Sequence, residues 1–230
     1  MKRLKAFLNW SSGKDSARAL WEIRKQKELH VDYLITTISD KYQRVSLHGI
    51  RKELLIQQFQ SIGIPYQILE IPDLPTNEEY EKIMEFHLNN LKMQGFDYAI
   101  FGDIFLEEVR SYRERQLSRY EIKAIFPLWG RDTKVLIQEF IELGFRAIVV
   151  SVNAEILGKE LLAQEINSYF LKQLPKNVDP CGEKGEYHTF CFDGPIFQFP
   201  IPFEIKEHVL KTYEYQNQKA SYWFCELLPK

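Results

Sequence analysis

The feature that most constrains this chain is a repeated alternation of short apolar runs with longer amphipathic segments. The first run, Leu4 to Trp10, has the composition of a buried strand, and the segment after Asp15 has the spacing of an amphipathic helix. The alternation continues through strands at 31–38, 66–71, 98–101, 124–126 and 145–152, and helices at 49–62, 77–95, 105–119 and 132–144. Strands that alternate with helices predict an α/β fold, in which a parallel sheet carries helices on both faces.

The alternation stops after Asn153. A helical pattern runs to about Leu174, a loop with several Gly and Pro residues follows, and the closing segments at 203–215 and 220–228 alternate like an antiparallel pair. We therefore expect two lobes that share one cleft. The first spans 1–152, and a smaller C-terminal α+β lobe spans 153–230.

Composition argues against several classes of protein. The chain has 30 Lys and Arg against 32 Asp and Glu, so no overall field favours nucleic acid or an anionic membrane as a partner. It has no membrane-length apolar run and no signal-peptide pattern, which predicts a cytoplasmic protein. The three cysteines are widely spaced and form no Cys-x-x-Cys motif, which argues against a disulfide scaffold and a zinc ribbon.

The loop after the first strand carries residue types that bind phosphate: Ser11, Ser12, Gly13, Lys14, Asp15 and Ser16. Such a loop lies at the carboxyl edge of a parallel sheet, where a helix start offers unpaired N–H groups. Gly13 lets the backbone approach a ligand, the serine hydroxyls and Lys14 match a polyphosphate, and Asp15 can cap the helix or hold Mg²⁺. The alternative is an ordinary turn with Ser12 and Asp15 as N-cap residues. A Walker A motif is excluded because Asp15 follows Lys14.

The sequence "SSGKDS" resembles the Ser-Gly-Gly-Lys-Asp-Ser loop of the PP-loop ATP pyrophosphatases, which cleave ATP to AMP and pyrophosphate. The resemblance implies a Rossmann-like fold of the adenine nucleotide alpha hydrolase-like kind, with residues 1–152 as the nucleotide-binding domain and with ATP and Mg²⁺ as ligands. It also implies that the loop holds the β and γ phosphates, while Thr36, Thr37 and Ile38 at the end of the second strand help to bind adenine. Ser12 stands where glycine is usual.

Two further motifs resemble the diphthine–ammonia ligase family and its bacterial relatives: "FGDIFLEEVRSYRERQ" at 101–116 and "DPCGEKGEYHTFCFDGPIF" at 179–197. The similarity covers Leu4 to about Phe197. It implies a ligase in which ATP adenylates a small-molecule or protein-borne carboxylate, and ammonia then forms the amide. In the family the carboxylate belongs to a modified histidine of a translation elongation factor. Lys184 and His188 depart from the family pattern, which has glycine and glutamate there.

These motifs supply the candidate catalytic residues Lys14, Asp15, Glu183, Glu186 and His188. The structural alternatives are two solvated loop acids and an exposed strand histidine. Asp103 follows Gly102 at the end of a strand, so we expect it to contact Mg²⁺, together with Asp15, or ribose. The alternative for Asp103 is a cap of the next helix.

Predicted substrate contacts come from three segments: His48 and Arg51 around the start of the second helix, Tyr112, Arg113 and Arg115 on a charged helix, and Gly182, Gly185 and Thr189 in the C-terminal motif. Mixed charge on a helix is more often a salt-bridged solvent face, and that alternative stays open for the charged helix.

Two other functions remain open from the sequence. An RNA-modification enzyme of the PP-loop class would need a basic RNA-binding face, which the near-neutral charge does not indicate. A regulatory protein would hold ATP or AMP without turnover, and such a sensor has no evident need for the loop at 181–189. The ligase hypothesis favours nitrogen over sulfur as the nucleophile, because the chain lacks paired cysteines. The carboxylate, the ammonia source and the oligomeric state stay undetermined, with a homodimer left open.

Overall fold

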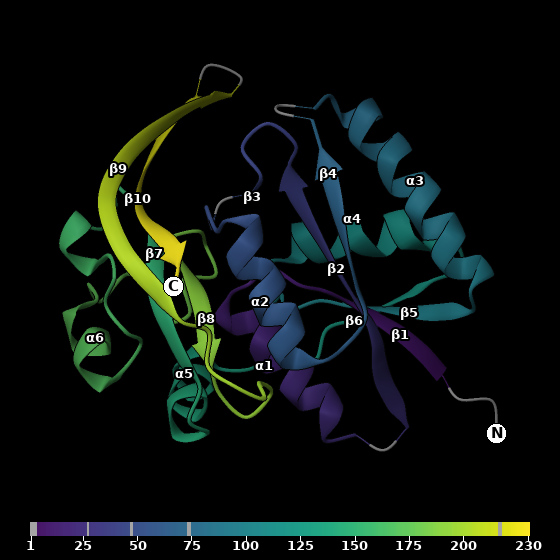
Figure 1. Cartoon of the computed structure of the whole chain (residues 1–230), viewed down its shortest axis with the longest axis horizontal. Coiled ribbons are helices and arrows are strands. Elements are labelled where there is room, and N and C mark those ends of the chain that lie inside the picture. The colour runs from purple at the N-terminus through teal and green to yellow at the C-terminus, as the bar shows by residue number, and fades with distance from the viewer. Residues whose placement is uncertain (1–3, 27, 47, 73–74, 216–217) are drawn as a thin grey trace.

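A six-stranded sheet forms the centre of the molecule (Figure 1). The computed structural model describes residues 4–26, 28–46, 48–72, 75–215 and 218–230. The strands of this sheet are β1 (Leu4–Asn9), β2 (Leu29–Ser39), β3 (Arg44–Val45), β4 (Tyr66–Ile71), β5 (Phe96–Ile100) and β6 (Lys123–Ile125). Their order is β3-β2-β1-β5-β6, with β4 paired to β2. The pairs are parallel except for β2 with β3, which confirms the predicted parallel sheet.

Four helices cover the two faces of this sheet: α1 (Lys14–Arg24), α2 (Lys52–Ile62), α3 (Asn77–Met93) and α4 (Glu107–Ser118). A fifth, α5 (Thr133–Glu142), lies beside α1, to which an ion pair between Glu139 and Arg18 links it. Successive side chains of β1 point to opposite faces and show which helices lie where. Leu8 packs in one buried cluster with Leu20 of α1 and Leu54 of α2. Phe7 packs in a second cluster with Leu91 of α3 and with residues of α4. Among the described residues, no helix has the length and apolarity needed to cross a membrane.

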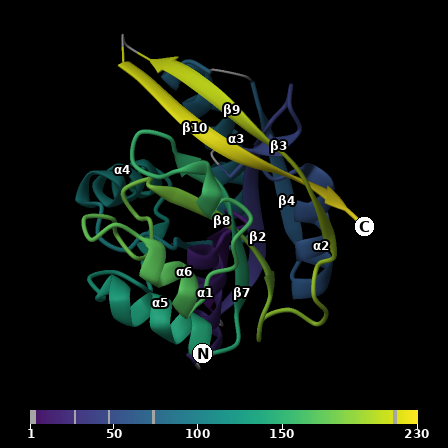
Figure 2. The same cartoon turned by 90° about the vertical axis from the view of Figure 1, so that its left-hand side faces the viewer.

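The C-terminal strands form a four-stranded sheet: β7 (Arg146–Asn153), β8 (Tyr187–Asp193), β9 (Phe203–Tyr215) and β10 (Gln218–Pro229). The β9 and β10 strands form the predicted antiparallel pair, a long ribbon in Figure 2. The prediction that 145–152 extends the parallel sheet is wrong, because β7 pairs antiparallel with β8 and β10. A continuous apolar run has the same pattern in either sheet, so tertiary packing decides its neighbours. The lobe boundary at 152–153 stays a prediction.

The predicted helix at 153–174 is wrong for most of its length. Within this segment, only a 3-10 turn at Lys159–Leu161 and α6 (Ser168–Gln173) are helical. Between them the chain runs beside β7, where Ile166 N donates a hydrogen bond to Ala147 O at 2.8 Å. This part of β7 is not paired with β10, so the segment covers an edge that would otherwise be open.

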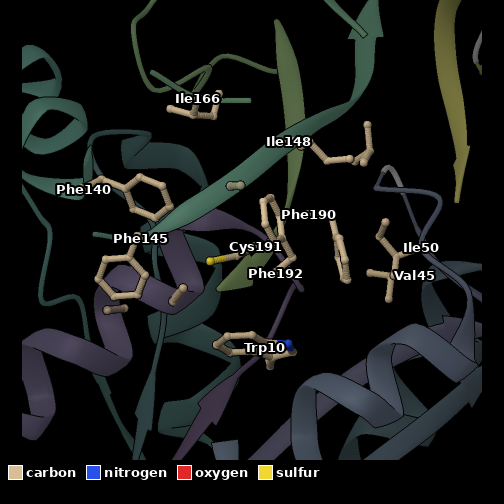
Figure 3. Packing of buried hydrophobic residues seen from close by; sticks show 14 of the residues in the cluster. Trp10, Val45, Ile50, Phe140, Phe145, Ile148, Ile166, Phe190, Cys191 and Phe192 are labelled. Atoms are coloured by element: carbon tan, nitrogen blue, oxygen red, sulfur yellow. The ribbon is translucent and has the colours of Figure 1, made fainter. Parts of the chain in front are cut away.

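One buried cluster joins the two sheets (Figure 3). Trp10, directly after β1, packs in it with Phe190 and Cys191 of β8 and with Ile50, which precedes α2. The backbone connects the same regions, because Cys191 N donates a hydrogen bond to Ser12 O at 2.9 Å. The cluster therefore holds β8 against the loop that leaves β1, at the carboxyl edge of the parallel sheet.

Candidate functional site

The loop predicted to bind phosphate lies between β1 and α1. Gly13 is the N-cap and α1 begins at Lys14, so the N–H groups of the first turn have no partner within the helix. Two glycines allow close approaches here. A Cβ at Gly13 would lie 2.6 Å from Cε1 of His48, and one at Gly102 would lie 2.8 Å from the backbone carbon of Asp15. The open helix start favours an anion as its ligand.

Ser12 adopts a left-handed backbone conformation, with a φ of 71°. This conformation costs a non-glycine residue about 1–2 kcal/mol, because Cβ comes close to the carbonyl oxygen. The hydroxyl of Ser12 is buried and has no hydrogen-bond partner among the described residues. Glycine, which PP-loop sequences usually carry here, would remove both the strain and the unpaired hydroxyl.

Gln58 of α2 holds this loop in place through hydrogen bonds. It was not predicted as a site residue. It is fully buried, and its Nε2 donates to Ser12 O at 3.0 Å and to Cys191 O at 2.6 Å. Its Oε1 accepts a hydrogen bond from Nε1 of Trp10 at 2.9 Å. The sequence could have pointed to Gln58, because it lies between Leu54 and Ile62 on the apolar stripe of a helix. A buried amide side chain needs hydrogen-bond partners.

Strand β8 contacts the phosphate loop through Thr189. Its Oγ1 accepts a hydrogen bond from Lys14 N at 3.0 Å, and its carbonyl oxygen lies 2.9 Å from Nδ1 of His48. The ring of His188, the preceding residue, packs on His48 with 4.8 Å between ring centroids. Residues from the two ends of the chain are therefore in direct contact at the start of α1.

Lys14, the first residue of α1, has a buried side chain. Its side chain pairs with Asp15, with 2.7 Å between Nζ and Oδ2. Burial by itself lowers the pKa of Lys14, but the pairing with Asp15 and the nearby Cys181 and Glu183 together outweigh this effect, and the pKa is raised. Its ammonium group also lies 5.4 Å from the ring centroid of Tyr187. Lys14 therefore stays positively charged and fixed in position.

A cleft of about 550 Å³ opens beside the loop, within the range of about 300–1,000 Å³ that is usual for ligand sites. The predicted residues that line it are Ser11, Asp15, Ser16, Thr36, Thr37, His48, Gly102, Asp103, Arg113, Glu183, Gly185 and His188. Asn9, Lys184 and Tyr222 also line the cleft and were not predicted as site residues. Asn9 ends β1 directly before the loop. The carboxyl end of a parallel strand is where ligands bind, so the sequence could have pointed to Asn9.

Carboxylates from three elements face this cleft. Arg113 pairs with Asp103, with 2.9 Å between Nε and Oδ2, and Ile104 N donates to Oε1 of Glu183 at 2.7 Å. Burial raises the pKa of Glu183 to about 7, and the negative charges of Asp15 and Asp103 add to the shift. Glu183 can therefore gain or lose a proton near neutral pH. Within the described part of the chain, no group of three or more His, Cys, Asp or Glu residues is arranged to hold a metal ion.

The other predicted residues do not line the cleft: Ser12, Gly13, Lys14, Gly182, Glu186 and Thr189, which belong to the phosphate loop and the segment packed against it, and Ile38, Arg51, Tyr112 and Arg115. Ile38 is fully buried in the core. Arg51 pairs with Glu226 of β10, with 2.6 Å between Nε and Oε1, so it links α2 to the C-terminal sheet. Arg115 is exposed on α4 and does not line the cleft, and Tyr112 lines a smaller adjacent pocket. Thr36 reaches the cleft, but its hydroxyl already donates to Trp10 O at 2.6 Å.

Glu186 supports the loop that carries Glu183, and its position does not match the expected catalytic role. Its Oε1 accepts a hydrogen bond from Asp179 N at 3.0 Å, and its Oε2 accepts one from Lys184 N at 2.9 Å. Both oxygens of this buried carboxylate are thus used inside the loop. Gly182 is also a loop-shaping residue, with a φ of 68° and no space for a Cβ.

Two family models match the chain. The diphthamide synthase N-terminal domain matches residues 4–124, and the diphthamide synthase C-terminal domain matches residues 132–222. The first match covers the parallel sheet and the phosphate loop, and the second covers the loop that carries Glu183 and the strand β8, which carries Thr189. The RNA-modification and regulatory alternatives are not favoured by these matches.

Curated relatives are diphthine–ammonia ligases. The Danio rerio protein is 30% identical over 145 residues, which cover 60% of this chain and 56% of the relative. The Mus musculus protein is 33% identical over 142 residues, which cover 59% and 52%. This chain thus spans about half the length of these relatives. Among solved structures, a U34-tRNA thiolase from Methanococcus maripaludis has a TM-score of 0.40 and 19% identity, and the match covers 63% of this chain and 59% of the thiolase.

Proposed function

This chain belongs to the diphthamide synthase family, and we propose that it is an ATP-dependent ligase that converts a carboxylate into an amide with ammonia. The observation that carries the proposal is the contact between the open start of α1 and Thr189. This contact holds the loop at 11–16 against β8. The same cleft is lined by Glu183, by Asp15 and Asp103, and by His48 and His188. An anion site and a group that titrates near pH 7 therefore adjoin one volume large enough for a nucleotide.

The proposed reaction solves the problem of a poor electrophile. A free carboxylate reacts slowly with ammonia because its leaving group would be oxide. A carboxylate oxygen instead attacks the α-phosphorus of ATP, pyrophosphate leaves, and the acyl-adenylate carries AMP as a good leaving group. Ammonia then forms the carbon–nitrogen bond as AMP departs. Holding both reactants in one cleft accelerates each step through proximity.

The location of each residue indicates its role in the proposed reaction. We assign the β and γ phosphates to the first turn of α1, where the N–H groups and Lys14 supply positive charge. We assign the adenosine to the carboxyl ends of β2 and β5, at Thr37 and Gly102. Glu183, with its raised pKa, accepts the proton that the attacking nitrogen releases.

Mg²⁺ fits beside Asp15 and Asp103. Both carboxylates line the cleft, and although burial is the main cause of the raised pKa of Glu183, their negative charges add to it. A divalent cation between them would reduce this repulsion. Mg²⁺ is usually bound by one or two carboxylates together with substrate phosphates, so a larger protein cluster is not required. When bound, the ion neutralises charge that develops on the phosphate oxygens.

The substrate proposal follows the relatives, which are named for diphthine and ammonia. Lys184 lines the cleft and His188 lies beside the phosphate loop, and both depart from the family pattern. Because the relatives are named for diphthine and ammonia, we propose diphthine-bearing elongation factor as the first carboxylate to test and free ammonium as the nitrogen source. We also propose a cytoplasmic location.

The test is product analysis with diphthine-bearing elongation factor, ATP, Mg²⁺ and ammonium. We expect AMP and pyrophosphate to appear only when all components are present, and we expect Lys14→Ala to reduce the rate by at least about 100-fold, as for loss of a charged phosphate contact. Lys25→Ala, at the exposed end of the same helix, is the matched control and should keep full activity. ADP and phosphate as products would contradict the proposal, and so would unchanged ATP binding in Lys14→Ala.

A further inference from the structure

His48 and His188 lie against the phosphate loop and have no part in the reaction steps assigned above. His48 precedes α2, whereas His188 belongs to β8, so only the tertiary fold brings them together. Their ring centroids are 4.8 Å apart, with 43° between the ring planes, and both side chains line the cleft. The ring of His48 also packs so close to Gly13 that a Cβ there would lie 2.6 Å from Cε1.

The hydrogen bond of His48 defines which nitrogen is free. Its Nδ1 lies 2.9 Å from the carbonyl oxygen of Thr189. A carbonyl oxygen only accepts hydrogen bonds, so Nδ1 carries the hydrogen in the neutral ring. Nε2 then keeps its lone pair, and protonation of this ring adds a hydrogen at Nε2. Thr189 therefore holds the ring by one edge and leaves the other edge able to take up a proton.

The surroundings keep both rings neutral in the free protein. Burial lowers the pKa of His48 to about 4, and the charge of Lys14 also disfavours protonation, although the bond to Thr189 opposes the shift. Burial, the adjacent His48 ring and Lys14 lower the pKa of His188 well below its usual value. Lys14 on α1 is the charged group that acts on both rings, and Tyr222 of β10 shares the cleft wall.

Binding of a polyphosphate favours the protonated form of one of the two rings. It brings several negative charges to the start of α1, the turn that both rings adjoin. An opposite charge within about 4–6 Å raises the pKa of a cationic group by roughly 1–3. The two rings are too close to be charged together, so one proton is the expected response of the pair.

We propose that His48 and His188 form the outer wall of the pyrophosphate site, and that the pair takes up one proton from solvent when a pyrophosphate group binds beside Gly13. The protonated ring donates a hydrogen bond to a phosphate oxygen. The proton returns to solvent when pyrophosphate leaves, so no net proton is consumed. This inference rests on the phosphate-loop assignment in the proposed function, and it adds a proton-linked contact that distinguishes this chain, because His188 stands where the family pattern has glutamate.

The test uses inorganic pyrophosphate as the probe and histidine ring NMR as the readout. The chain has five histidines, so the ring signals can be assigned with single variants. His30 and His208 are exposed and serve as internal references. With saturating pyrophosphate, we expect the titration midpoint of one member of the pair to rise by about 2–3 pH units. We expect the midpoints of the reference histidines to change far less.

Variants separate this inference from the proposed function. His48→Asn keeps a side-chain N–H that can reach Thr189 O and removes Nε2, so it tests proton uptake with the loop contact retained. We expect His48→Asn and His188→Gln to weaken pyrophosphate binding at pH 6 by about 2–10-fold, and by less at pH 8. Pyrophosphate binding that depends on Lys14 while both ring midpoints stay constant would overturn this inference alone. No pyrophosphate binding to the wild-type protein would overturn both proposals.

Discussion

The backbone N–H of Lys14 and the side-chain hydroxyl of Thr189 are 175 residues apart in the chain and are joined by a 3.0 Å hydrogen bond. Lys14 opens the first helix of the parallel sheet, and Thr189 belongs to β8 of the antiparallel sheet. This bond satisfies one of the N–H groups that a helix start leaves unpaired. It also sets the distance between the phosphate-loop candidate and the C-terminal loop, so we expect its loss to affect both stability and nucleotide binding.

Thr189→Val tests this bond with a side chain of the same shape. The change leaves the buried N–H of Lys14 without its acceptor, so we expect a loss of about 1–3 kcal/mol in unfolding free energy and weaker ATP binding. Urea unfolding and calorimetry with ATP measure the two effects. Thr212→Val is the matched control, because its 2.9 Å bond to Ser221 is exposed, and it should change stability by less than about 0.5 kcal/mol. Equal effects of the two changes would contradict the role of Thr189.

Gln58→Leu tests the buried amide beneath the loop. It removes the partners of Trp10 Nε1, Ser12 O and Cys191 O together, so we expect a loss of about 2–5 kcal/mol in unfolding free energy. Thermal and urea unfolding measure it. Gln60→Leu, an exposed position on the same helix, is the control and should be nearly neutral. A Gln58 variant as stable as the control would show that these bonds contribute little.

Ser12→Gly tests backbone strain. Glycine removes the cost of the left-handed conformation and a buried hydroxyl without a described partner, so we expect the protein to become more stable by about 0.5–2 kcal/mol. The greater freedom of glycine in the unfolded chain offsets part of this gain. Ser16→Gly, inside α1, is the opposite case and should cost about 1 kcal/mol. Destabilisation by both changes would exclude strain at Ser12.

Glu183 predicts a pH dependence of stability in the nucleotide-free protein. Its pKa is about 7 in the folded state against an ordinary value of 4.5. The folded protein therefore holds this proton more tightly than the unfolded chain does. The stabilising contribution is complete below pH 4.5 and is lost as pH rises through 7, by at most about 3 kcal/mol.

Glu183→Gln removes this titration and keeps an oxygen that can accept the bond from Ile104 N. We expect the variant to gain stability over the wild type between pH 4.5 and pH 7 and to keep a constant advantage above it. Urea unfolding at several pH values measures the difference. Glu155→Gln, at an exposed position, is the control. Stability curves of wild type and Glu183→Gln that stay parallel across this range would show that Glu183 is not protonated near pH 7.

Some of the site could be predicted because it depends on local sequence. The loop from Ser11 to Ser16 follows a strand and opens a helix, and that placement alone directs its N–H groups to one edge of the sheet. Asp103 and Glu183 were predicted in the same way, from motifs at strand ends and in a glycine-containing loop, and both line the cleft. For Glu186 and Arg51 the motif identified the position but not the partner, because the loop amides and Glu226 that bind them are brought close only by folding.

The sequence by itself determined the alternating strands and helices, because side-chain periodicity and turn residues act within a few positions of the chain. Only the tertiary structure decided that β7 joins the antiparallel sheet, that 153–174 consists mostly of turns and irregular backbone, and that Gln58 and the pair of His48 and His188 lie at the phosphate loop. These outcomes depend on contacts between residues far apart in the chain. An apolar run or a buried amide has the same local pattern whichever partner it meets.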